Sequence, residues 1–68
     1  EYSAIESYSK AVELDPSLAL AHIYLARAFI LTKQYERALI SIQQGLEFNP
    51  AHNSARQMLA DLQKVLNR

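Results

Sequence analysis

Two histidines and three clustered serines are the residues whose types most often serve in catalysis or metal binding. His22 and His52 lie 30 residues apart and the chain has no cysteine, so the sequence offers no compact set of metal ligands. Ser3, Ser7 and Ser9 have no histidine nearby that could activate a hydroxyl group as a nucleophile. We expect packing or surface roles for these side chains, with no metal ion and no cofactor.

Motifs typical of enzymes are absent from the sequence. It contains no glycine-rich phosphate loop, no His-Glu-x-x-His pair and no nucleophile elbow, so we do not expect an enzyme. Seven basic and seven acidic residues cancel in this chain of 68 residues, which argues against a nucleic-acid partner. The longest apolar stretch, residues 19–31, is interrupted by His22 and Arg27 and is shorter than the roughly 20 residues of a membrane span. Protein binding and a structural role remain, and the cellular compartment is left open.

A 34-residue internal repeat indicates how the chain is organised. Residues 13–16 read Glu-Leu-Asp-Pro, and residues 47–50 read Glu-Phe-Asn-Pro. The same offset pairs identical residues elsewhere, namely Ala4 with Ala38, Ser7 with Ser41, Ala21 with Ala55, Leu25 with Leu59 and Ala26 with Ala60. A period of this length is typical of stacked repeat units.

Four helices are predicted within this repeat. Helix-forming residues dominate the composition, and apolar residues recur at helical spacing over residues 2–14, 16–31, 35–48 and 50–66. We place Pro16 and Pro50 in the first turn of the helices that they begin, with Asp15 and Asn49 as N-caps. The short connections between the helices require antiparallel neighbours.

Small residues at equivalent places in the repeat predict close contacts between helices. They are Ala4, Ala11, Ala26, Ala38, Gly45 and Ala60, and bulky side chains flank them. Gly45 is the single glycine, and inside a helix it costs about 0.5–1 kcal/mol relative to alanine. We interpret it as a point of close helix contact, with the approach of a ligand as the alternative. The predicted core is Leu25, Ala26, Phe29, Ala38, Ile42 and Leu59.

These positions resemble the tetratricopeptide repeat, a 34-residue helix–turn–helix unit. The resemblance covers residues 1–66, with a complete unit marked by His22, Leu25, Ala26, Phe29, Ala38, Ile42, Gly45 and Pro50, and a preceding half-unit marked by Ala4, Tyr8, Ala11 and Pro16. It implies an all-α fold of antiparallel repeats, an α-solenoid, present as a fragment of about two repeats. Two positions depart from the family pattern, because His22 replaces an aromatic residue and Lys33 replaces a frequent glycine. A left-handed conformation at Lys33 would store roughly 1 kcal/mol of strain.

The resemblance also sets the order of the units. Residues 1–15 correspond to the second helix of a truncated repeat, 16–49 to a complete repeat, and 50–68 to a lone first helix. In this last helix Arg56 and Gln63 are polar where a following helix would pack, while the opposite face carries Ala55, Met58, Leu59 and Leu62. An amphipathic helix of this kind predicts a C-terminal cap of the stack.

The resemblance implies that a protein or peptide partner binds in the concave groove lined by the first helices. The corresponding residues are Leu20, Ile23, Tyr24, Arg27 and Ile30, followed by Ser54, Gln57, Met58 and Asp61. The family's carboxylate clamp is not reproduced, since Ile23, Tyr24, Arg27 and Met58 occupy its places. An apolar strip with one arginine suits an amphipathic helix or an extended peptide with an acidic anchor. The alternative is that Ile23 and Tyr24 pack against neighbouring helices and that Arg27 only solvates the groove.

A structural role is the second hypothesis, in which the segment caps a longer scaffold or mediates self-assembly. In the family the stripe that here is Ala4, Tyr8 and Ala11 packs against a preceding helix. We expect this stripe, with the edges of Ile5 and Val12, to face water, and we expect the isolated chain to form a two-fold homodimer through it. The alternative is that Tyr8 folds onto its own helix and the end frays.

Overall fold

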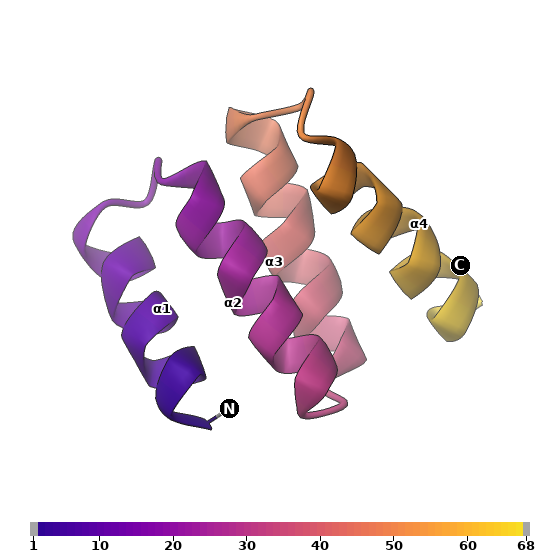
Figure 1. Ribbon diagram of the computed structural model, residues 1–68, viewed down its shortest axis with the longest axis horizontal. Helices are drawn as coiled ribbons and strands as arrows, with labels where there is room; N and C mark the ends of the chain where they lie inside the picture. Colours follow the sequence, from indigo (N-terminus) through magenta and orange to yellow (C-terminus); the bar gives the residue numbers. More distant parts are fainter. Residues whose placement is uncertain (1, 68) are drawn as a thin grey trace.

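The computed structural model describes residues 2–67, and this part of the chain contains four helices and no strand. They are α1 (Tyr2–Leu14), α2 (Ala19–Leu31), α3 (Tyr35–Phe48) and α4 (Asn53–Leu66). Figure 1 shows them side by side in sequence order, each antiparallel to the one before it. The predicted all-α, four-helix architecture is therefore confirmed. None of these helices is both long and apolar enough to cross a bilayer.

The start of α2 differs from the sequence expectation. Pro16 lies in a turn and the helix begins at Ala19, because the Leu18 amide donates to the Asp15 carbonyl at 3.1 Å. The Asp15 carboxylate accepts hydrogen bonds from the Ser17 amide at 3.2 Å and from its hydroxyl at 2.7 Å. Proline favours the second position of such a turn, where its fixed φ fits and no amide is needed. Asp15 thus stabilises the turn, and its assignment as the N-cap of α2 was wrong.

The start of α4 repeats this arrangement. Pro50 lies in a turn closed by the His52 amide, which donates to the Asn49 carbonyl at 3.3 Å, and α4 begins at Asn53. His52 is the N-cap, since its Nδ1 accepts a hydrogen bond from the Ala55 amide at 3.1 Å. The cap predicted at Asn49 was also wrong, and both helices start three residues later than expected.

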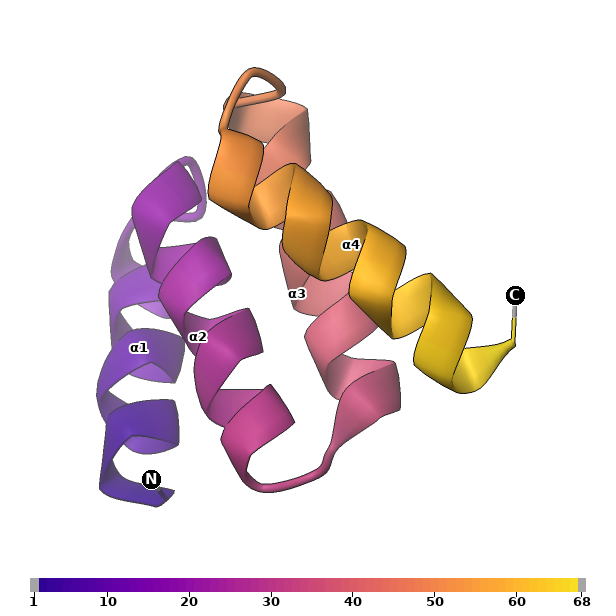
Figure 2. The same cartoon turned by 45° about the vertical axis from the view of Figure 1, so that its right-hand side comes forward.

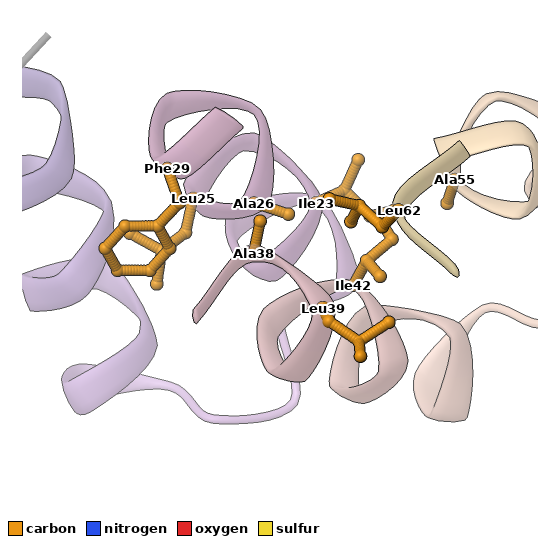
Figure 3. Packing of buried hydrophobic residues seen from close by; sticks show 9 residues of the cluster. All are labelled: Ile23, Leu25, Ala26, Phe29, Ala38, Leu39, Ile42, Ala55 and Leu62. Atoms are coloured by element: carbon orange, nitrogen blue, oxygen red, sulfur yellow. The ribbon is translucent and has the colours of Figure 1, made fainter. Parts of the chain in front are cut away.

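The core is centred on α2, which lies between α1 and α3. Figure 3 shows Ala26 and Ala38 facing each other between α2 and α3, while Leu25 and Phe29 point toward α1. The buried cluster consists of Ile23, Leu25, Ala26, Phe29, Ala38, Leu39, Ile42, Ala55 and Leu62. All of the predicted core residues are buried except Leu59, which is only half-buried. The repeat equivalent of Leu59 is Leu25 on α2, which packs against both α1 and α3. Leu59 is less buried because α4 packs mainly against α3.

Gly45 marks a close approach of α2 and α3. A Cβ atom at this position would lie 2.9 Å from Ile23 Cγ1 and 3.3 Å from both the Ala19 carbonyl oxygen and His22 Cβ. The interpretation as a close helix contact is confirmed, because α2 fills the space that a ligand would need. Ala60, expected in a similar contact, is instead exposed, since no described helix packs on that face of α4.

Lys33 has a left-handed backbone in the turn between α2 and α3, with φ of 61°. Around it the Gln34 amide donates to the Phe29 carbonyl at 2.8 Å, and the Lys33 amide donates to the Ile30 carbonyl at 3.0 Å. Such bonds satisfy the last carbonyls of a helix and favour glycine at the left-handed residue. The strain anticipated at Lys33 therefore has a structural basis.

Candidate functional site

A pocket of about 440 Å³ lies between α2 and α4, with the N-terminal end of α3 as its third wall. It exists because α4 packs mainly against α3. In the view of Figure 2, α4 diverges from α2 toward its C-terminal end. The lining side chains are Arg27, Ile30, Tyr35, Ser54, Gln57, Met58, Asp61, Leu62 and Val65.

Most of the groove residues expected from the sequence meet in this pocket. Those brought together from the two helices are Arg27, Ile30, Ser54, Gln57, Met58 and Asp61. The sequence reasoning missed Tyr35, Leu62 and Val65. The sequence contained a signal for Val65, because the 34-residue offset pairs it with Leu31, an apolar residue that is exposed in the structure. The sequence contained no such signal for Tyr35, which lines the pocket only because α4 diverges from α2 (Figure 2).

Ile23 is not a groove residue. Its side chain is 1% exposed and packs where Gly45 leaves room on α3, so it offers no surface to a partner. The alternative interpretation, packing against a neighbouring helix, is the correct one for this residue. Periodicity alone could not show this, because the tilt of α3 against α2 decides which edge of the apolar strip is covered.

Leu20 and Tyr24 are on the surface but outside the larger pocket. Leu20 is 50% exposed and lines neither pocket. Tyr24 lines a second pocket of about 220 Å³ between α1 and α2, with Ala4, Tyr8, Arg27, Ala28 and Leu31. Arg27 lines both pockets, so the apolar strip expected from the sequence is divided between two pockets that share this arginine.

Arg27 and Asp61 place opposite charges on the two walls of the larger pocket. The Arg27 guanidinium carbon lies 5.8 Å from the centre of the Tyr24 ring, a cation–π contact that orients the side chain. Within residues 2–67 it forms no ion pair with a carboxylate. Asp61 accepts a hydrogen bond from the Gln57 amide nitrogen at 3.1 Å, and no described cation pairs with it. Both charged groups are therefore available to a ligand.

The stripe of Ala4, Tyr8 and Ala11 is half-buried rather than open to water. The ring of Tyr8 lies 5.6 Å from that of Tyr24, at an interplanar angle of 33°. Ile5 and Val12, whose edges were expected to face water, pack against the core cluster. The expected exposure of this stripe was too large, because α2 covers one side of it.

Both histidines make contacts that stabilise the fold. His22 is 3% exposed, donates from Nε2 to the Pro16 carbonyl at 2.8 Å, and stacks on Phe48 with ring centres 6.0 Å apart. Its Nδ1 is buried without a hydrogen-bond partner among the described residues. His52 is the N-cap of α4. The described part of the chain contains no group of three or more residues that could hold a metal ion.

Comparison with known families identifies a related repeat family. A family model described as tetratricopeptide repeat matches residues 3–64. No curated protein and no solved structure matches the chain significantly. The match covers all but the ends of the four-helix arrangement.

Proposed function

The chain belongs to the tetratricopeptide-repeat family, and on this basis we propose that the pocket between α2 and α4 binds a peptide or helix of a partner protein. Repeats of this family generally act as protein–protein interaction modules and are typically non-catalytic scaffolds. The pocket is the feature of this chain on which such a role would depend.

The convergence of side chains from two repeat-related helices on one pocket carries the proposal. Its floor and sides are largely apolar, with Leu62 buried and Ile30, Tyr35 and Met58 half-buried. The polar lining residues Arg27, Ser54, Gln57 and Asp61 are all exposed, which places them at the rim. An apolar concavity with a few polar groups at its edge is the usual form of a binding site.

A selection from a displayed random-peptide library tests this proposal. Selected peptides should shift the NMR signals of the pocket residues, and Arg27→Glu should weaken the binding of those with an acidic anchor while leaving helicity intact. Arg37→Glu is the matched control, because Arg37 is exposed on α3 and lines neither pocket. The proposal is wrong if the peptides map to the opposite face around Ser7, Lys10 and Gln44, or if they leave the signals of the pocket residues unchanged.

A structural role in ending a stack is the second candidate function. Arg56, Ala60 and Gln63 are exposed on α4, where their counterparts His22, Ala26 and Phe29 on α2 are buried. A polar outer face of this kind suits the last helix of an array. Under this proposal residues 50–68 form the cap, after a partial unit at 1–15 and a complete unit at 16–49.

Self-association through α1 belongs to the same candidate. In α3 the equivalent residues Ala38, Ile42 and Gly45 are buried, whereas Ala4, Tyr8 and Ala11 keep part of their surface open to a second copy. Sedimentation across a range of concentrations tests it. A homodimer that Tyr8→Lys dissociates supports this role, and a monomer at high micromolar concentration that Tyr8→Lys leaves unchanged excludes it.

A further inference from the structure

The larger pocket has an apolar lining and enough room to receive a large side chain of a partner. Its volume of about 440 Å³ lies toward the lower end of the ~300–1,000 Å³ common for ligand pockets. The buried Leu62 forms part of its lining, and Val65 leaves 60% of its surface open beside it. A large apolar side chain entering here would cover both residues together with Met58.

The charges beside this apolar lining differ from one wall to the other. Arg27 on α2 and Asp61 on α4 are 34 residues apart, so they occupy the same position of successive repeats with opposite sign. Within residues 2–67 Arg27 is oriented by Tyr24 and Asp61 by Gln57, and neither is neutralised by an ion pair. A ligand of uniform charge would be attracted by one wall and repelled by the other.

We propose that the pocket recognises a protein segment in which a large apolar residue lies between an acidic and a basic residue. The apolar side chain enters the pocket, the acidic residue pairs with Arg27, and the basic residue pairs with Asp61. This inference rests on the proposed function and adds the charge pattern of the partner. The two charges can occur in either order along the partner, because an extended segment can lie across the pocket in either direction.

Three synthetic heptapeptides test the charge pattern. Each has acetylated and amidated ends and a central leucine, and they differ only in the residues two places on either side, which are Glu and Lys, Glu and Glu, or Lys and Lys. NMR titration should give the tightest binding for the Glu and Lys peptide, by about threefold over each of the others. Asp61→Lys should transfer the preference to the Glu and Glu peptide, and Arg27→Glu should transfer it to the Lys and Lys peptide.

Two further comparisons test the apolar anchor. Replacing the central leucine of the probe by alanine should weaken binding on the order of tenfold. Val65→Ser should also weaken it, whereas Ile40→Ser should not. Ile40 is a matched control, because this aliphatic residue is 56% exposed on α3 and lines neither pocket.

The outcomes separate this inference from the proposed function. Equal affinity of the three peptides, or equal effects of Val65→Ser and Ile40→Ser, overturns the charge-and-anchor pattern. If library-selected peptides still map to the pocket in that case, the proposed function stands without the pattern. If neither the selected peptides nor the heptapeptides shift the pocket signals, both fail.

Discussion

Replacing Gly45 by alanine should destabilise the protein, although alanine is the better helix former. The new Cβ would lie 2.9 Å from Ile23 Cγ1, closer than such carbon atoms pack in proteins. Ile23 is 1% exposed, so its branched side chain has no open space to move into. The Ala19 carbonyl at 3.3 Å adds a backbone atom that can move only if α2 moves.

Two opposing effects set the magnitude of this change. Alanine gains about 0.5–1 kcal/mol over glycine inside a helix. Overpacking a tight core contact costs about 1–3 kcal/mol. The net effect should make the Gly45→Ala variant about 1 kcal/mol less stable than the unchanged protein. This corresponds to a fall in Tm of about 4–8 °C for a domain of this size.

Thermal and urea unfolding followed by far-ultraviolet circular dichroism measure this difference. The exposed neighbour Gln44 provides the control, since Gln44→Ala should be more stable than Gln44→Gly by about 1 kcal/mol in the same turn of α3. Gly45→Ala should therefore have the opposite sign from this reference pair. A Tm at or above that of the unchanged protein would refute the reasoning.

A double-mutant comparison identifies Ile23 as the obstacle. Ile23→Ala removes the γ carbons, so Gly45→Ala should cost less in that background, measured in trimethylamine N-oxide to keep the weakened domain folded. Ile23→Val keeps both γ carbons and should give no such relief. Equal costs of Gly45→Ala in the two backgrounds would show that the contact with Ile23 is not the cause.

Three further substitutions test other parts of the structure by the same unfolding measurements. Leu25→Ala should lower the free energy of unfolding by about 2–5 kcal/mol, because it leaves a cavity in the core. Leu14→Ala is the control, since this side chain is 78% exposed and its loss should change stability by less than about 0.5 kcal/mol. Similar values for the two variants would show that Leu25 is not a core residue. Lys33→Gly should raise stability by about 0.5–1 kcal/mol, because relief of left-handed strain exceeds the added entropy of the unfolded chain, and a lower Tm would contradict this. His52→Ala should lower the free energy of unfolding by about 1 kcal/mol, because it removes the acceptor for the Ala55 amide. An unchanged Tm would show that this cap does not contribute to stability.

The sequence alone was sufficient for the helices and most of the core. The 34-residue offset pairs residues that occupy the same position on α1 and α3, or on α2 and α4, so it identified the repeat, the close contact at Gly45 and the burial of Leu25 and Ile42. These features follow from local spacing, because residues three or four apart share one face of a helix. The sequence did not determine where α2 and α4 begin. A proline after Asp15 or Asn49 suits both the first turn of a helix and the second position of a β-turn. In the structure both prolines lie in turns, which are closed by hydrogen bonds from the Leu18 and His52 amides.

The candidate site depended on tertiary structure. Spacing placed Ile23 and Arg27 on one helix face, but only the close contact at Gly45 shows that Ile23 is buried while Arg27 remains at the surface. Likewise, Tyr35 and Val65 join the pocket because α4 packs on α3 and diverges from α2. The direction of a helix relative to its neighbours is set by how side chains from both helices fit together. The 34-residue period determines which positions are equivalent. It does not determine how the side chains of neighbouring helices pack, because that packing depends on the volumes of residues far apart in the chain.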